Sequence, residues 1–184
     1  MELRTVAIGG SAAGSTLPGS HAPTEFEQVY REYGAMVHRY CLARLGDANA
    51  AEDAAAQTFE AAFRAYERVR PRRETVYFWL LKIARNAVID EIRRQSRLRR
   101  LTDRLWHTQA PNPDPETTVV IRSELLALLQ ASRRLSKRDR ELVALRCAAD
   151  LSYREIGELV GLSENSATVA TRRAFARLRV AMEG

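Results

Sequence analysis

The spacing of apolar residues along the chain predicts helices throughout and no β-strand. Up to residue 98, apolar residues recur at helical intervals in three stretches, from Thr24 to Gly46, from about Ala50 to Tyr66 and from about Glu74 to Arg97. The inward faces are expected to carry Phe26, Val29, Tyr30, Tyr33, Val37, Tyr40, Cys41 and Leu45, then Ala55, Phe59, Ala62, Phe63 and Tyr66, then Val76, Leu80, Ile83, Ala84, Ala87 and Val88. Thr24 and Glu27 form a capping box that starts the first helix.

A change of composition separates these helices from a second set. Residues 99–116 contain Pro111, Pro113 and Pro115, and each residue before a proline is disfavoured in a helix, so this segment is expected to be a flexible linker. Helices resume near 118–133 and 137–147, and two more follow. The sequence therefore predicts the all-α class, with two small helical domains at 24–98 and 117–184, after a disordered tail at 1–23.

The last two helices have the sequence of a helix-turn-helix. Ser152 is followed by Glu155 at the spacing of a capping box, and Ser163 can cap the final helix. Between them, Gly161 can adopt the left-handed conformation that ends a helix. A short turn of this kind joins the helix pair of many DNA-binding domains, so duplex DNA is the first partner to consider.

The final helix divides into two faces. Ala167, Thr171, Ala174, Phe175 and Leu178 are expected to face the preceding helices. The opposite face offers side chains for base edges and phosphates, namely Asn165, Thr168, Val169, Arg172 and Arg173, with Ser166 beside them. The alternative is that this face is an ordinary solvated surface of a helix bundle.

The third helix carries a second candidate surface. Trp79, Asn86, Asp90, Arg93 and Arg97 fall within about 60° of one another at about 100° per residue. A cluster of three arginines, at Arg70, Arg72 and Arg73, precedes this helix. Aromatic platforms with cationic rims suit unpaired bases, so this stripe is a candidate single-strand site. The alternative is an internal helix with a solvated edge and a core tryptophan.

Composition agrees with an anionic partner and excludes several other classes. The formal net charge is +6, and the longest wholly apolar run, Val76 to Leu81, is far too short to span a membrane. The N-terminus makes a poor signal peptide, so a cytoplasmic protein is expected. Cys41 and Cys147 lack metal-site spacing and are expected to be buried or half-buried thiols, so no metal or cofactor is expected.

Three segments resemble one family in the right order. Residues 78–94, FWLLKIARNAVIDEIRR, closely resemble the WL-x-x-IARN-x-x-ID-x-x-RR helix of bacterial RNA polymerase sigma factors of the extracytoplasmic-function (ECF) group. Residues 51–59, AEDAAAQTF, are similar to the AEDLVQETF segment of that group, and residues 135–179 are similar to its C-terminal region. The resemblance covers nearly everything from Phe26 to Arg179.

The resemblance implies a function for each domain. The first would be sigma domain two, which docks on the beta-prime coiled coil of core RNA polymerase and captures the melted non-template strand of the minus-ten element. The second would be sigma domain four, which meets the beta flap and reads the minus-thirty-five duplex. The chain would thus direct core polymerase to promoters and assist their opening, without catalytic residues of its own.

The resemblance also assigns residues. The polymerase-binding positions would be Asp53, Gln57 and Glu60; the minus-ten positions would be Arg70, Arg72, Arg73, Trp79, Asn86, Asp90 and Arg93; and the minus-thirty-five positions would be Asn165, Ser166, Thr168, Val169, Arg172 and Arg173. The segment 70–75 would hold a flipped base.

The chain departs from the family pattern at two places. Ala54-Ala55 replaces a common Leu-Val pair, which predicts a smaller apolar docking contact, and Thr168 and Ala170 replace common cations of the recognition helix, which predicts an unusual promoter preference. Three alternatives stay open: a sigma-like regulator that no longer initiates transcription, a helix-turn-helix regulator that acts without replacing sigma, and a nucleic-acid enzyme, for which no catalytic motif is found. Whether an anti-sigma factor binds also stays open.

Overall fold

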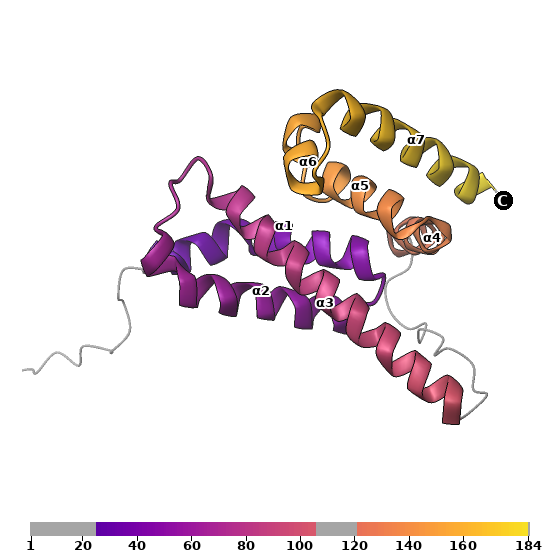
Figure 1. The fold of residues 1–184 in the computed structure, drawn as a ribbon, viewed down its shortest axis with the longest axis horizontal. Coiled ribbons are helices and arrows are strands. Elements are labelled where there is room, and N and C mark those ends of the chain that lie inside the picture. The colour runs from indigo at the N-terminus through magenta and orange to yellow at the C-terminus, as the bar shows by residue number, and fades with distance from the viewer. Residues whose placement is uncertain (1–24, 106–120, 184) are drawn as a thin grey trace, which may run out of the picture.

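The computed structural model describes residues 25–105 and 121–183, and within these ranges the chain forms helices and no strand (Figure 1). The helices are α1 (Glu25–Leu45), α2 (Ala48–Val69), α3 (Val76–Leu105), α4 (Ile121–Arg134), α5 (Lys137–Cys147), α6 (Tyr153–Val160) and α7 (Glu164–Glu183). The all-α fold class is therefore confirmed. The predicted tail, the Thr24 cap and the proline segment lie outside the described residues.

Helices α1, α2 and α3 pack against one another and form the first domain. Their shared core contains Val37, Tyr40, Ala51, Leu80 and Val88, all essentially inaccessible to solvent. The helix α2 begins at Ala48 because the side chain of Asp47 caps it, accepting from the Ala50 amide at 2.8 Å. Most of the core was thus predictable from helical periodicity, whereas the start of α2 was predicted slightly too late.

Two aromatic residues predicted to be buried are exposed. Phe63 is 65% exposed and Tyr30 is 56% exposed. Each of these rings contacts an aromatic neighbour: the ring centroid of Phe63 lies 5.2 Å from that of Phe26, and the ring centroid of Tyr30 lies 4.7 Å from that of Phe59. The prediction was wrong because three helices cover one another only along their common axis, and within the described residues no helix covers the rings of Tyr30 and Phe63.

The helix α3 continues to Leu105, past the predicted end of the first domain at Leu98. Its C-terminal half extends beyond α1 and α2 (Figure 1). The side chain of Glu91 receives hydrogen bonds from Arg94 and Gln95 one turn on, and arginine, leucine and glutamine are good helix formers. The predicted linker start at residue 99 was therefore too early, since residues 99–105 belong to α3.

Helices α4 to α7 form the second domain, in which α7 packs against α4, α5 and α6. Its core contains Leu142, Leu145, Leu151 and Ile156. The predicted inner face of α7 is confirmed, because Ala167, Thr171, Ala174 and Leu178 are buried and Phe175 is half-buried against the core.

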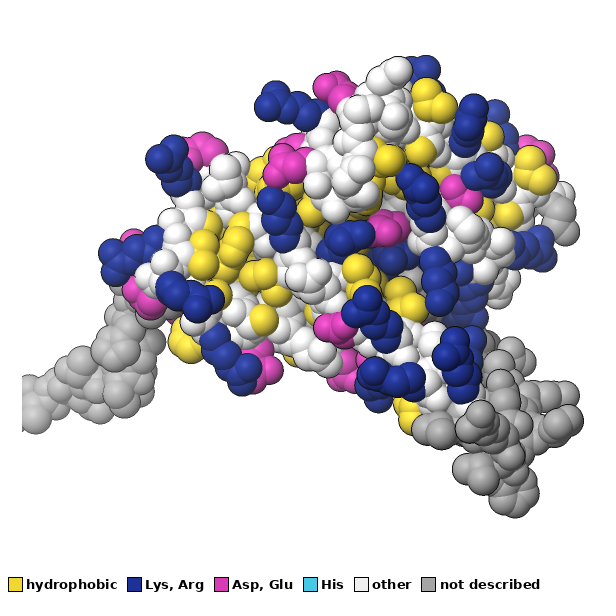
Figure 2. Space-filling model, in the orientation of Figure 1, with side chains coloured by type: hydrophobic (Ala, Val, Ile, Leu, Met, Phe, Trp, Pro, Cys, Tyr) yellow, Lys and Arg dark blue, Asp and Glu magenta, His cyan; other side chains and the backbone are white. Residues whose placement is uncertain are grey.

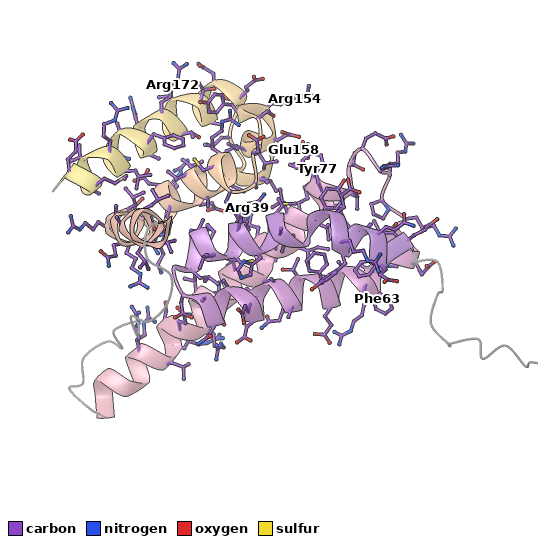
Figure 3. The ribbon with its side chains drawn as sticks, turned by 180° about the vertical axis from the view of Figure 1, so that it is seen from behind. Arg39, Phe63, Tyr77, Arg154, Glu158 and Arg172 are labelled. Atoms are coloured by element: carbon purple, nitrogen blue, oxygen red, sulfur yellow. The ribbon has the colours of Figure 1, made fainter. Side chains whose placement is uncertain are left out.

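The two domains lie against each other, although the linker had suggested independent units. The guanidinium of Arg133 donates to the carbonyl oxygen of Gly46 at 2.5 Å, and that of Arg44 donates to the carbonyl oxygen of Lys137 at 3.2 Å. The hydroxyl of Tyr77, at the start of α3, donates to the carboxylate of Glu155 on α6. Figure 3 shows Tyr77 at the junction of the domains, near Glu158 of the same helix α6. The first domain is thus covered on one side by α5 and α6.

No helix in the described ranges combines the length and apolar character required to cross a bilayer.

Cys41 is buried in the first domain, and this burial raises the pKa of its thiol to about 12. Cys147 is exposed, so the prediction of a buried or half-buried thiol was wrong at that position. It is the last residue of α5.

Candidate nucleic-acid and polymerase interfaces

The turn between α6 and α7 has the geometry that the sequence predicted. Ser152 and Glu155 form a reciprocal capping box at the start of α6. Gly161 ends α6 with a φ of 72°, in the left-handed region that favours glycine. The amide of Leu162 then donates to the carbonyl oxygen of Gly157 at 2.8 Å, and the Ser163 hydroxyl accepts from the Ser166 amide at 3.2 Å. Backbone and cap bonds thus fix the angle between α6 and α7.

The outer face of α7 is available for a partner. Asn165, Ser166, Val169, Arg172 and Arg173 are exposed, and Thr168 is half-exposed. Figure 3 shows Arg172 on the side of α7 that points away from the first domain. The structure therefore brings all six predicted duplex-contacting residues to one accessible helix.

Within this face the side chains are not equivalent. The Thr168 hydroxyl donates to the carbonyl oxygen of Glu164 at 2.9 Å, so its donor is engaged inside the helix. Arg177, further along α7, is bonded to both carboxylate oxygens of Asp139 on α5 at 2.9 and 3.0 Å. Arg177 therefore holds α7 to the domain. Within the described residues, Arg172 and Arg173 form no ion pair with a carboxylate, and both are exposed.

The predicted stripe on α3 is also accessible. Asn86, Asp90 and Arg93 are exposed, while Trp79 is half-buried with its ring 6.3 Å from that of Tyr66. Arg93 and Asp90 form an exposed pair at 3.4 Å. The stripe therefore offers one anchored indole edge followed by amide and guanidinium groups along a single helix face.

The segment 70–75 joins α2 directly to this stripe. Arg70 has a φ of 43° and caps α2, with its backbone amide donating to the Tyr66 carbonyl. The backbone amide and the hydroxyl of Thr75 both donate to the carbonyl oxygen of Arg72, which gives the segment a defined turn. Arg72 and Arg73 are exposed. Three arginines thus lie immediately before the first turn of α3. At the opposite, projecting end of α3, Figure 2 shows further Lys and Arg side chains gathered on the surface.

The predicted docking residues share one face of α2. Asp53, Gln57 and Glu60 are exposed and lie three or four residues apart, and Glu60 pairs with Arg64. Ala54 is only 1% exposed and packs in the core. The substitution at Ala54 therefore alters core packing, and the expectation that it shrinks the docking contact was wrong at that residue.

Beside this face, α1 and α2 leave a groove of about 600 Å³. It is lined by Tyr30, Arg31, Gly34, Ala35, His38, Arg39, Glu52, Ala55, Ala56 and Phe59. The half-buried Ala55 contributes to this groove, so the second of the two substituted alanines does affect a surface next to the docking residues.

The charged residues at the domain junction were not predicted from the sequence. Lys82 and Arg85 lie on α3 and are bonded to Glu158 and Glu141 of the second domain. Lys82 and Arg85 lie between Trp79 and Asn86 of the predicted stripe in the sequence. No pattern in the sequence indicates that they pair with acids more than fifty residues away.

Comparison with known families assigns both domains. Residues 29–98 match the family description sigma-70 region 2, and residues 125–178 match sigma-70 region 4. The chain belongs to the sigma-70 family, in its ECF group, and is a sigma factor, a class of transcription initiation factor. Sigma regions 2 and 4 are the parts that meet core RNA polymerase and promoter DNA.

Similar proteins and structures agree with this assignment. The chain is 31% identical over 154 residues to the ECF sigma factor BldN of Streptomyces coelicolor, covering 83% of this chain and 58% of BldN. It is 26% identical over 155 residues to SigL of Mycobacterium tuberculosis, covering 84% and 87% of the two chains. The sigma factor RpoE of Bartonella quintana, solved with the anti-sigma factor NepR, has the same fold, with a TM-score of 0.67, 20% identity and coverage of 86% of this chain and 97% of RpoE.

Proposed function

We propose that this sigma factor recognises promoters through two separate nucleic-acid surfaces, one for an unpaired strand and one for a duplex. The observation that carries the proposal is the pairing of the α3 stripe with a helix-turn-helix whose outer face is exposed. A duplex reader alone has no use for an exposed strand-binding stripe on a second domain. Two such surfaces fit a factor that both reads and opens promoters.

For the minus-ten element, the first domain supplies the strand-binding groups. Asn86 and Arg93 can bond base edges and phosphates, and Trp79 offers a ring edge near the bases. The turn at Arg70, Arg72 and Arg73 holds a flipped base. Asp90 keeps Arg93 oriented through their ion pair.

For the minus-thirty-five element, α7 enters the major groove from its N-terminal end. Asn165 and Ser166 lie in the first turn, where base edges are within reach, and Thr168 and Val169 follow. Arg172 and Arg173 lie about a turn further on, where phosphates are nearer. The sequence preference therefore depends on the first turn, and the salt dependence on the two arginines.

Binding to core polymerase uses the exposed face of α2, where Asp53, Gln57 and Glu60 meet the beta-prime coiled coil, while the second domain meets the beta flap. Polymerisation chemistry belongs to the core enzyme, so the chain is not itself an enzyme, and it acts in the cytoplasm. The solved relatives RpoE and CnrH are bound to the anti-sigma factor NepR and to the cytosolic domain of CnrY, respectively, which supports an anti-sigma factor as a further partner.

The function is tested by adding the purified chain to sigma-free core polymerase with a genomic promoter library and sequencing the transcript starts. We expect starts downstream of a shared pair of elements, which core polymerase alone does not give. The competing function is a regulator that binds its operator unaided. Nanomolar, sequence-specific duplex binding by the free chain at physiological salt, without new transcript starts, would favour that regulator.

A further inference from the structure

Two cations of α3 are paired with acids of the second domain. The ammonium group of Lys82 lies 3.1 Å from a carboxylate oxygen of Glu158, and Nε of Arg85 lies 2.6 Å from a carboxylate oxygen of Glu141. The Arg85 pair is partly shielded, with the side chains 27% and 13% exposed, whereas both partners of the Lys82 pair are about half exposed. The second domain thus places carboxylates along one side of α3.

These cations adjoin the strand-binding stripe. Lys82 comes three residues after Trp79 and four before Asn86, which is the spacing of neighbours on one helix face. Arg85 comes three residues after Lys82, about 60° further round the helix on the side that faces the second domain. An unpaired strand lying along the stripe would carry its phosphates past Lys82, and the long side chain of Arg85 is the next cation beyond it.

We propose that Lys82 and Arg85 bind phosphates of the unpaired strand, and that Glu158 and Glu141 occupy this phosphate site while the two domains are packed together. Carboxylate and phosphate accept hydrogen bonds from the same cationic donors, so the acids fill the place of the strand. The inference rests on the proposed function, because it requires that the α3 stripe captures an unpaired strand.

The packed arrangement cannot persist on a promoter. The minus-ten and minus-thirty-five elements are, by their names, roughly 25 base pairs apart, which is about 85 Å of duplex. A chain whose α6 touches α3 cannot reach both elements at once. Separation of the domains breaks both ion pairs and leaves two cations exposed beside the stripe. The exposed Lys82 pair contributes little to holding the domains together, whereas the partly shielded Arg85 pair must also be broken when they separate.

The test measures binding of the full chain to a fluorescein-labelled, mixed-sequence DNA strand of about 20 nucleotides, longer than the roughly 4–16 nucleotides that one OB-fold domain covers. Fluorescence anisotropy is recorded over a range of salt concentrations. Glu141→Gln with Glu158→Gln keeps the shape of both side chains and removes their charges. We expect this double variant to bind the strand about three- to tenfold more tightly than the parent.

A matched control separates site occupancy from net charge. Glu183→Gln removes one negative charge from the end of α7, and Glu158→Gln removes one from the junction. Only the junction variant should gain affinity beyond the small effect of net charge. Equal affinities for these two single variants, or no gain in the double variant while its circular dichroism spectrum and melting temperature match those of the parent, would overturn the proposal.

A second set of variants identifies the cations. Adding Lys82→Gln and Arg85→Gln to the double glutamine variant should remove the gain and reduce the salt slope by about 1.4, for two phosphates on a single strand. If Arg85→Gln disturbs folding, Lys82→Gln is added alone, and the salt slope of binding should then fall by half as much. A gain that persists without these cations would show that the acids cover a different site. Strand capture itself is tested separately by Asn86→Ala with Arg93→Ala, and no loss of binding there would refute the stripe rather than the acids.

Discussion

Gly157, in the first helix of the helix-turn-helix, is packed so tightly against the turn that one methyl group should destabilise the second domain. A Cβ atom at Gly157 would lie 2.6 Å from the carbonyl oxygen of Leu162 and 3.4 Å from the carbonyl carbon of Ser163. These atoms are backbone, and the Leu162 amide is bonded to Gly157 at 2.8 Å. The turn therefore cannot move away without stretching that hydrogen bond.

The expected change in the free energy of unfolding is the sum of one stabilising and two destabilising contributions. In an unobstructed helix interior, Gly→Ala stabilises by about 0.5–1 kcal/mol, because alanine has fewer unfolded conformations. Overpacking costs about 1–3 kcal/mol, and a weakened hydrogen bond costs up to about 1 kcal/mol more. We therefore expect Gly157→Ala to lower the free energy of unfolding by about 1–3 kcal/mol.

Gly34 provides the matched control, because it also lies inside a helix but a Cβ atom there meets nothing within 4 Å. Gly34→Ala should raise the free energy of unfolding by about 0.5–1 kcal/mol, the opposite sign. Urea unfolding of the full-length variants, followed by circular dichroism, measures both. If Gly157→Ala proved as stable as Gly34→Ala, the close approach of α6 to the turn would be wrong.

Three further predictions test the proposed surfaces. Gln57→Ala with Glu60→Arg should weaken binding to core polymerase while the melting temperature changes only slightly, since both side chains are exposed and the exposed Glu60–Arg64 pair contributes little. A double variant that competes for core as well as the parent would remove these residues from the docking surface. Asn86→Ala should depress transcription from a duplex promoter far more than from a template with a pre-melted bubble, and equal losses would assign this residue to folding or docking. Arg173→Ala should weaken binding to all minus-thirty-five sequences similarly and lower the salt slope of binding by about one unit. Asn165→Ala should instead relax the preference at one or two base pairs by about 1–3 kcal/mol. An unchanged preference profile for Asn165→Ala, measured on single-base variants of the element, would argue against base reading.

Much of the fold could be predicted because its signals are local. Helical periodicity gave the inner face of α7, and Ser152, Glu155 and Gly161 marked the turn, since caps and left-handed glycines act over a few residues. The candidate surfaces on α3 and α7 were found in the same way, from side chains that share a helix face. Their accessibility agrees with those predictions, while their roles stay predictions.

Burial at the edges of the bundle was harder to predict. Phe63 follows the apolar period of α2 and was expected in the core, yet it points outward, away from the second domain (Figure 3). Periodicity shows which side of a helix is apolar, but not how far neighbouring helices cover it. The end of α3 was missed for a related reason, since polar helix formers such as Arg97 and Arg100 continue a helix without an apolar signal.

The sequence by itself determined that this protein is helical, that it has a helix-turn-helix, and that it is similar to the ECF sigma factors. Only the tertiary structure decided that the two domains pack together and that acids of one cover cations of the other. Lys82 and Glu158 are separated by 76 residues, and a pair of opposite charges at that distance has no pattern that distinguishes it from any other. Such contacts depend on how complete domains dock, which is a property of their surfaces rather than of any local segment.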